Sequence, residues 1–404
     1  MPSLPRNAPL YDPAEHRPLS GGAWSDGAAR AAIEEIVADV VGAYGGTEQL
    51  WPNDPNDLEG MPDVPLRNVY MGAAGVAWAL DLIAQDELCE RPPWLHELAR
   101  GLGEGYRKAP ELTEIEPPPA ASLMFGESGI LLAAEAILRD GSQLDGLIEC
   151  IKRNARSGRL ELCWGSPGTL IAALQLWRHT AEPRWRDAWL DSAAWLLDQW
   201  RDEVWVQDLY GDQSRYTGAG HGFAGNAFAL LAGRDLLGEA ADQVTGRVLA
   251  EMRKLAVTKD RVTQWPPLVG VKDGRRPVQW CHGAPGFVTS LSPVLPPDEE
   301  TERLLTAGGE LTWRAGPLVK SVGLCHGTAG NAYALLALWT RTEGELWFER
   351  ARSFAMDAVA DTQRRRAQAG RGRYTLFTGD LGVALLLRSL LVADPTFPFV
   401  EAAF

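Results

Sequence analysis

Two short stretches of the sequence repeat a cysteine, a histidine and a glycine in the same order. The first is "WCHGAPG" from Trp280 to Gly286, and the second is "LCHGTAG" from Leu324 to Gly330. Each leads into an apolar run that is typical of a buried helix. Because a helix can begin without a cysteine or a histidine, these residue types indicate a chemical role beyond folding.

Thiolates and imidazoles are the usual protein ligands of zinc, and three such ligands leave a fourth position open for a substrate or water. We predict a zinc (Zn²⁺) site formed by Cys281, Cys325 and His326, with His282 as an alternative to His326. The positive ends of the following helices would help to keep the thiolates ionised. The alternative is that the cysteines are small packing residues and the histidines cap turns. The long gap between the cysteines matches no compact zinc-finger pattern.

The two stretches belong to a series of seven Gly-x-x-Gly turns, each followed by small and apolar residues. The first glycines of these turns are Gly72, Gly126, Gly165, Gly222, Gly283, Gly327 and Gly379. Each run is apolar nearly all round, and a more amphipathic segment precedes each one. This alternation predicts seven inner helices that are buried on most of their surface and seven outer helices with one wet face.

Alternating inner and outer helices either stack as an open solenoid or close into a ring. Inner helices without a polar face need neighbours on every side, which favours closure. We therefore predict an all-α fold, an α/α toroid of seven outer and seven inner helices, in a single domain over residues 1–404. The repeats would occupy about residues 72–391, and the N-terminal extension with the first outer helix residues 1–71. The inner-helix starts would then meet in one cup.

Composition excludes several classes of protein. The formal net charge of -14, without a basic block, argues against a nucleic-acid partner. The N-terminus lacks the apolar core of a signal peptide, and no apolar run reaches membrane-spanning length, so we expect no transmembrane segment. The five cysteines are odd in number and scattered, which favours a reducing, cytoplasmic location. Cys89, Cys150 and Cys163 are interpreted as packing residues.

The motifs resemble those of the lanthionine synthetase C-like proteins, which include lanthipeptide cyclases and eukaryotic LanC-like proteins. The resemblance rests on "WCHGAPG", "GLCHGTAGNAYALL", "GAGHGFAGNAFALL" and the seven glycine turns. It implies a seven-fold α/α toroid with zinc at Cys281, Cys325 and His326. It also implies that a thiol is added to a dehydroalanine or dehydrobutyrine of a peptide or protein, which forms a thioether. The thiol would come from a peptide cysteine or, as in the LanC-like branch, from glutathione.

The same resemblance implies roles for residues outside the zinc set. His221 occupies the family's position for the general acid that protonates the enolate, and Glu161 is similar in place to an acidic residue of the cyclases, which would orient His221 or accept a proton. A turn histidine and a helix cap are the simpler alternatives for these two residues. Lys320 and Arg373 match basic positions that contact the glutathione carboxylates in the LanC-like branch, and solvated surface charges are the alternative for both.

The sequence departs from the lantibiotic cyclases at its first zinc cysteine. Those cyclases commonly have a tyrosine after this cysteine and an arginine just before it, whereas this chain has His282 after it and Arg276 nearby but offset. We therefore expect His282 to face the substrate as a third catalytic candidate beside His221 and Glu161, with Arg276 as a further substrate-binding candidate, as in a LanC-like protein. The repeats leave no room for a dehydratase or kinase, so a separate protein is expected to make the dehydroamino acid.

Two other classes of function remain open on the sequence. One is a non-catalytic, zinc-containing protein that binds glutathione or a peptide. The other is a sugar-cleaving enzyme, because α/α toroids also carry that chemistry, with Glu127 and Asp380 as the two carboxylates. The second class leaves both Cys-His pairs unexplained.

Overall fold

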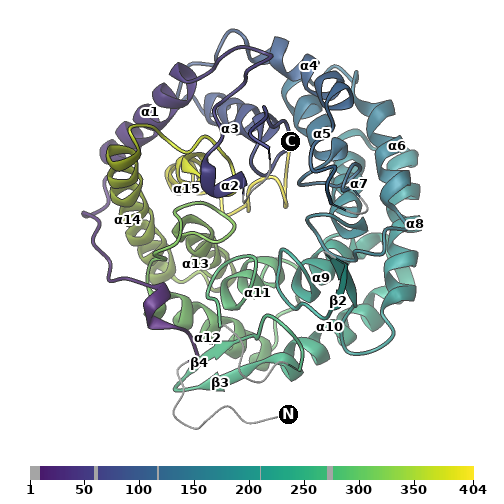
Figure 1. Cartoon of the computed structure of the whole chain (residues 1–404). Coiled ribbons are helices and arrows are strands. Elements are labelled where there is room, and N and C mark those ends of the chain that lie inside the picture. Colours follow the sequence, from purple (N-terminus) through teal and green to yellow (C-terminus); the bar gives the residue numbers. More distant parts are fainter. Residues whose placement is uncertain (1–9, 59–61, 116–117, 210, 271–275) are drawn as a thin grey trace.

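The computed structural model describes residues 10–58, 62–115, 118–209, 211–270 and 276–404. Its helices form two concentric rings (Figure 1). The outer ring consists of α1 (Asp26–Gly42), α4 (Leu95–Lys108), α6 (Leu144–Asn154), α8 (Pro183–Gln199), α10 (Ala241–Leu255), α12 (Glu299–Ala315) and α14 (Glu345–Ala369). The inner ring consists of α3 (Ala73–Gln85), α5 (Glu127–Leu138), α7 (Ser166–Thr180), α9 (Phe223–Leu231), α11 (Ala284–Leu291), α13 (Thr328–Thr342) and α15 (Asp380–Val392). The predicted α/α toroid of seven inner and seven outer helices is confirmed.

Burial of the helices follows the sequence pattern. In the inner helix α5 every residue from Glu127 to Ile137 is buried, as its nearly uniform apolar composition requires. In the outer helix α4 the buried positions recur every three or four residues: Leu95, Leu98, Ala99, Leu102, Gly103 and Tyr106. One face of each outer helix therefore packs on the inner ring while the other faces water.

The second glycine of each turn allows an inner helix to begin directly against the segment that precedes it. A Cβ atom on Gly286 would lie 2.0 Å from the Trp280 carbonyl oxygen, and one on Gly330 would lie 1.7 Å from the Leu324 oxygen. No side chain fits at such distances, so only glycine permits this close approach. In these two turns the cysteine and histidine are thereby held at the start of the inner helix.

Backbone hydrogen bonds join neighbouring turns at six of the seven junctions, through the residue two places before each first glycine; the junction between Cys163 and Gly220 is the exception. These residues are Tyr70, Met124, Cys163, Gly220, Cys281, Cys325 and Phe377. The N–H to oxygen distances are 3.1 Å from Tyr70 to Met124, 3.2 Å from Met124 to Cys163, 3.3 Å from Gly220 to Cys281, 3.1 Å from Cys281 to Cys325, 2.8 Å from Cys325 to Phe377 and 3.1 Å from Phe377 to Tyr70. Residues far apart in the sequence become neighbours around one cup.

Several short elements lie in the segments between or before the long helices. Strand β1 (Gln207–Leu209) pairs antiparallel with β2 (Asp212–Ser214), and β3 (Val257–Lys259) pairs antiparallel with β4 (Val262–Gln264). The one-turn helix α2 (Pro55–Leu58) lies at the mouth of the toroid in Figure 1. The 3-10 helices are η1 (Pro13–Glu15), η2 (Arg234–Leu236) and η3 (Gly238–Ala240).

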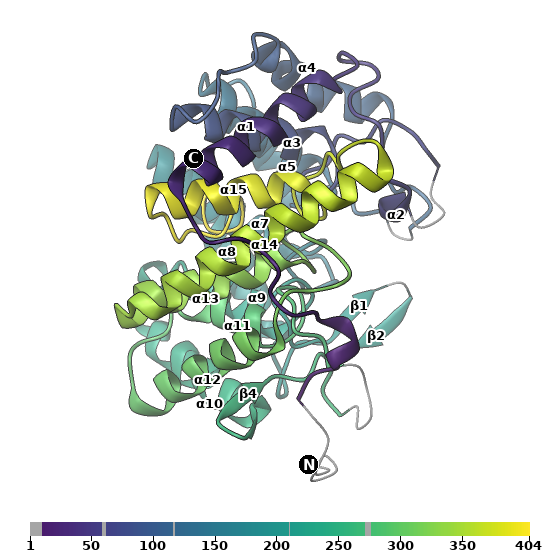
Figure 2. The same ribbon diagram turned by 90° about the vertical axis from the view of Figure 1, so that its left-hand side faces the viewer.

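The N-terminal segment over residues 10–20 passes along the outside of the toroid before α1 begins (Figure 2). The Val319 N–H donates to the Glu15 oxygen at 3.0 Å, and the Arg17 N–H donates to the Pro317 oxygen at 3.0 Å. Arg17 also forms an ion pair with the buried Asp357 of α14 at 2.6 Å. The segment is thus anchored beside the chain that leads to Cys325.

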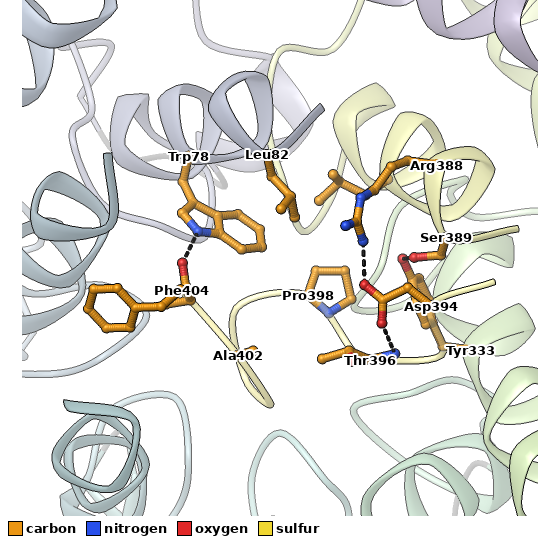
Figure 3. Close-up of a pocket in the computed structure, with 12 residues that line it drawn as sticks. Trp78, Leu82, Tyr333, Arg388, Ser389, Asp394, Thr396, Pro398, Ala402 and Phe404 are labelled. Carbon is orange, nitrogen blue, oxygen red and sulfur yellow. Dashed lines mark hydrogen bonds and ion pairs between the residues drawn. The ribbon is translucent and has the colours of Figure 1, made fainter. Parts of the chain in front are cut away.

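The C-terminal segment crosses the centre of the toroid at the end away from the helix starts. Figure 3 shows it beside Trp78 of α3 and Arg388 of α15, around a cavity of about 180 Å³. The Trp78 indole N–H donates to the Ala403 oxygen at 2.8 Å. Phe397 is buried and stacks on Trp280 with ring centroids 4.7 Å apart. Among the described residues, no helix is both long and apolar enough to cross a membrane.

Candidate metal centre and acid-base pair

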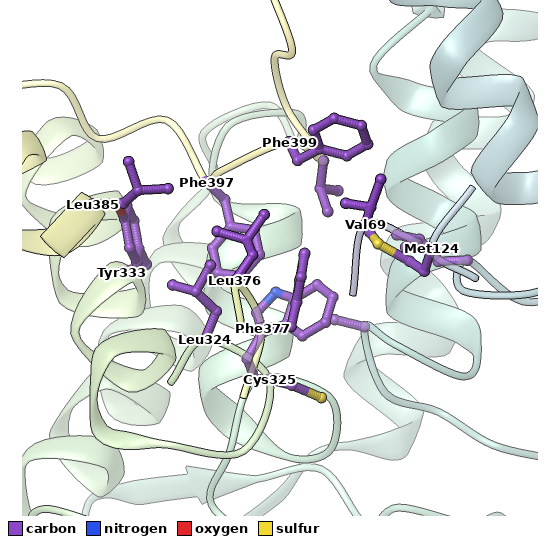
Figure 4. Close-up of a cluster of buried hydrophobic side chains, with 14 of the residues drawn as sticks. Val69, Met124, Leu324, Cys325, Tyr333, Leu376, Phe377, Leu385, Phe397 and Phe399 are labelled. Carbon is purple, nitrogen blue, oxygen red and sulfur yellow. The ribbon is translucent and has the colours of Figure 1, made fainter. Parts of the chain in front are cut away.

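Three of the sequence-predicted site residues meet at the starts of α11 and α13. The possible ligand atoms of Cys281, Cys325 and His326 lie within 4.8 Å of one another. Both cysteines are buried, and the Cys281 N–H donates to the Cys325 oxygen at 3.1 Å, so the backbone fixes their separation. In Figure 4 Cys325 lies at the edge of a buried apolar cluster, next to Phe377. The sulfur atoms therefore lie in dry surroundings.

The pKa values of the two thiols in this centre are shifted in opposite directions. Hydrogen bonding to Cys325 and burial raise the pKa of Cys281. The hydrogen bond from Cys281 lowers the pKa of Cys325 well below its usual range; burial opposes this, and His326 and the Tyr70 hydroxyl add to it. The Gln279 side-chain amide also donates to the Cys281 sulfur at 3.0 Å. Two buried sulfurs surrounded by donors, with one imidazole beside them, fit the ligand set that zinc prefers.

A second pair of predicted residues lies next to this centre. The His221 Nδ1 atom is 2.8 Å from the Glu161 Oε2 atom. Glu161 is fully buried and also accepts the N–H groups of Cys163 at 3.0 Å and Trp164 at 2.5 Å. Glu161 therefore orients the imidazole and also caps its own turn. The orienting role and the capping role considered for Glu161 are compatible with each other.

The environment favours the protonated form of His221. Burial works against it, but the hydrogen bond and negative charge of Glu161 outweigh burial, and Cys325 contributes in the same direction, so the pKa of His221 is raised above 6.5. A histidine with a raised pKa keeps its proton to higher pH and is a suitable general acid near neutrality.

His282 faces the same cup with the opposite electrostatic character. Its ring centroid lies 5.7 Å from that of His221 and 5.6 Å from that of Tyr216. Burial lowers the pKa of His282 to about 3, and the neighbouring His221, His326 and Lys320 act in the same direction. His282 is therefore neutral at physiological pH.

The family follows from comparison with known proteins. A family model described as lanthionine synthetase C-like protein matches residues 66–402. The chain belongs to the lanthionine synthetase C-like family. This confirms the resemblance that the glycine turns and the Cys-His pairs indicated.

Two curated relatives align with part of this LanC-like chain. It is 34% identical over 193 residues, 47% of the chain and 46% of the relative, to a protein of Danio rerio named glutathione S-transferase LANCL1. It is 38% identical over 132 residues, 31% of the chain and 30% of the relative, to LanC-like protein GCL1 of Arabidopsis thaliana. The aligned segments thus span less than half of these relatives.

A solved structure extends the comparison to almost the whole LanC-like chain. Nisin cyclase superposes with a TM-score of 0.67 and 14% sequence identity, covering 94% of this chain and 98% of that one. At such low identity the similarity shows the shared toroid fold and nothing finer.

The predicted substrate-binding residues of this LanC-like chain do not gather in one place. Lys320 and His282 line a cavity of about 430 Å³. Arg276 directly precedes Pro277, which lines the same cavity. Arg373 lies instead in a separate cavity of about 330 Å³.

Arg373 has a partner that the sequence did not reveal. Its guanidinium forms a two-pronged ion pair with the buried Asp57 of α2, with the Nε atom 2.8 Å from one carboxylate oxygen. Burial of the guanidinium acts to lower the pKa of Arg373, but the Asp57 carboxylate outweighs burial. The pKa of Arg373 is therefore raised above its usual value. Two of the three guanidinium nitrogens are therefore already engaged by Asp57 before a substrate carboxylate binds.

The two carboxylates considered for sugar cleavage are also engaged. Glu127 forms ion pairs with Arg107 of α4 at 2.5 Å and with Arg153 of α6 at 2.7 Å. The Asp380 carboxylate accepts the Arg373 N–H at 3.2 Å. Glu127 is therefore directed to the outer ring.

Sequence reasoning missed two residues of the site. The Tyr70 hydroxyl hydrogen-bonds Cys325. The Cys163 sulfur lies within 4.8 Å of the possible ligand atoms of Glu161 and His221. Cys163 is buried in the hydrophobic core, as the packing interpretation expects, and it also lies in the cup. The signal was present, because Tyr70 and Cys163 stand two places before their first glycines, as Cys281 and Cys325 do.

Proposed function

We propose that the protein adds a thiol to a dehydroalanine or dehydrobutyrine of a peptide or protein and so forms a thioether. The observation that carries this proposal is the meeting of two devices in one cup. One is the Cys281, Cys325 and His326 trio, and the other is the pair of His221 with Glu161. The 3.3 Å hydrogen bond from the Gly220 N–H to the Cys281 oxygen joins the two devices through their backbones.

Cys281, Cys325 and His326 would hold a zinc ion that, when bound, supplies a Lewis acid able to lower the pKa of a substrate thiol. The addition needs the thiol proton to leave to solvent and a proton to arrive at the α-carbon. A carbon–sulfur bond forms at the β-carbon while the carbon–carbon π bond breaks and its electrons move into an enolate.

His221 then gives its proton to the α-carbon. Its raised pKa keeps that proton available at neutral pH, and the buried carboxylate of Glu161 stabilises the imidazolium before transfer. Glu161 is accordingly a positioning residue. His282, which is neutral, serves as a hydrogen-bonding contact for the substrate rather than as an acid.

Glutathione is the thiol donor that we propose. The support is the 34% identity to the relative named glutathione S-transferase LANCL1 and the cavity that holds Lys320, Gln279 and His282 beside Cys281. The ammonium group of Lys320 can pair with a glutathione carboxylate. A separate dehydratase or kinase would supply the dehydroamino acid.

The test uses a synthetic peptide that contains dehydroalanine and no cysteine. Incubation with the protein and glutathione should give a product heavier by one glutathione, whereas a second peptide with both dehydroalanine and cysteine should not cyclise when glutathione is absent. Cyclisation of the second peptide without mass gain would assign the cyclase activity instead. No product from either peptide would contradict the proposed function.

A further inference from the structure

A second set of possible metal ligands lies beside the first. Glu161 and Cys163 precede α7, His221 precedes α9, and their candidate ligand atoms lie within 4.8 Å of one another. Glu161 and Cys163 are buried, while 23% of the His221 side chain remains exposed. We call Glu161, Cys163 and His221 the second trio.

The second trio is related to the first by the repeat of the fold. In the first trio, Cys281 and Cys325 stand two places before the first glycines of consecutive turns, and His326 stands one place before. In the second trio Cys163 and His221 occupy the corresponding positions of the third and fourth turns. The remaining position is Gly220, which has no side chain.

Glu161 supplies the ligand atom that Gly220 does not. Its carboxylate is already fixed by two backbone N–H groups, from Cys163 at 3.0 Å and Trp164 at 2.5 Å, so no reordering of its side chain is needed to face the other two ligands. One thiolate, one imidazole and one carboxylate are all ordinary zinc ligands, and three of them leave a fourth position open. Because part of the His221 side chain is exposed to the cup, we expect the open fourth coordination position to face the cup as well.

We propose that the second trio is an inhibitory zinc site. A zinc ion there displaces the thiol proton of Cys163 and the proton between His221 and Glu161, both of which leave to solvent. His221 then keeps only the proton on its other ring nitrogen, so it is no longer an imidazolium that can act as the acid, and Glu161 no longer accepts its hydrogen bond. The inference that the second trio binds zinc rests on the positions of its ligand atoms alone. The inference that this zinc inhibits rests also on the proposed function. Zinc beyond one equivalent should therefore stop the reaction that the first equivalent supports.

Metal stoichiometry tests the site without reference to activity. The protein carrying its first zinc equivalent is dialysed against rising zinc concentrations, and bound zinc is measured by mass spectrometry of the metal. We expect two equivalents for the unchanged protein, one for Cys163→Ser and two for the control Cys89→Ser, which removes a half-buried thiol elsewhere. Equal zinc binding by the unchanged protein and Cys163→Ser would overturn the proposal.

A second variant and a spectroscopic measurement guard against misfolding. Cys163→Ala should lose the same equivalent, and thermal unfolding should show that both variants remain folded. Cadmium, which binds the same ligands, should add a thiolate-to-metal absorption band with its second equivalent in the unchanged protein and none in Cys163→Ser. A second band of equal strength in Cys163→Ser would contradict the ligand assignment.

The inhibitory effect is tested with the dehydroalanine peptide and glutathione. Zinc in excess of one equivalent should lower the rate of the unchanged protein at least tenfold and that of Cys163→Ser by much less. Equal inhibition of both would overturn the inhibitory role. If neither adds glutathione at any zinc concentration, the proposed function fails, while the stoichiometry still decides whether the second trio binds metal.

Discussion

The His221 imidazole lies 2.8 Å from the Glu161 carboxylate, between the third and fourth turns of the inner ring. At the six other junctions between neighbouring turns a backbone hydrogen bond makes the connection. The third and fourth turns are thus joined by two ionisable side chains, His221 and Glu161. This is also the place where the proposed chemistry needs a mobile proton. This relationship gives His221, the proposed general acid, both its orientation and its raised pKa.

The first prediction concerns the pH dependence of thiol addition. Glu161, which hydrogen-bonds His221, raises the pKa of His221 above 6.5, and Cys325 helps, while His282 and Tyr216 also face the ring. A general acid works while it is protonated, so activity should fall as the pH rises through this raised pKa. In Glu161→Gln the carboxylate charge is lost, and the basic limb of the pH–rate profile should move to lower pH.

The control for this prediction is His221→Asn, which removes the titrating group. Its rate should fall about 10²–10⁴-fold, without the original basic limb. Bound zinc in the first trio should be unchanged in both variants, as metal analysis would show. A Glu161→Gln profile that keeps the limb at its original pH would show that Glu161 does not set the pKa of His221.

The second prediction concerns metal content. Cys281→Ala removes one of two sulfurs from the first trio, so the first zinc equivalent should be lost together with thiol addition, because two thiolates and one imidazole are the proposed ligands. Cys150→Ala is the matched control, since Cys150 is also buried but lies in α6. Full zinc content in Cys281→Ala, measured after dialysis, would exclude this trio as the zinc ligands.

Much of the fold could be predicted from the sequence because each inner helix needs the same glycine turn. The Gly286 and Gly330 backbones approach other backbone atoms so closely that no other residue fits, and this requirement leaves a regular mark in the sequence. The Cys-His pairs stand out for the same reason, because neither residue type is needed to start a helix.

Other parts of the site depend on contacts that no local pattern records. The partner of Arg373 is Asp57, which belongs to a one-turn helix 316 residues away. Tyr70 resembles an ordinary core aromatic until ring closure brings it to Cys325. The C-terminal segment that fills the centre of the toroid, with Phe397 on Trp280, is also fixed only by tertiary structure.

The third prediction concerns Tyr70. Its hydroxyl hydrogen-bonds Cys325, and its ring stacks on Phe377 with centroids 5.3 Å apart. Tyr70→Phe keeps the stacking and removes only the hydroxyl, so zinc affinity should fall about 10-fold to 100-fold, as is typical when a residue that hydrogen-bonds a metal ligand is changed. Competition with a chelator measures this. An unchanged affinity would mean that the hydroxyl does not support the site.

The last prediction links the C-terminal segment to the stability of the toroid. Phe397 is 1% exposed and packs on Trp280, whose chain neighbour is Cys281. Phe397→Ala would leave a cavity beside Trp280, so the free energy of unfolding should fall by about 3–5 kcal/mol. Val392→Ala, at a position that is 41% exposed, should change it far less. Chemical denaturation of both variants decides this, since equal stabilities would mean that the C-terminal segment only covers the toroid and does not support the turn that carries Cys281.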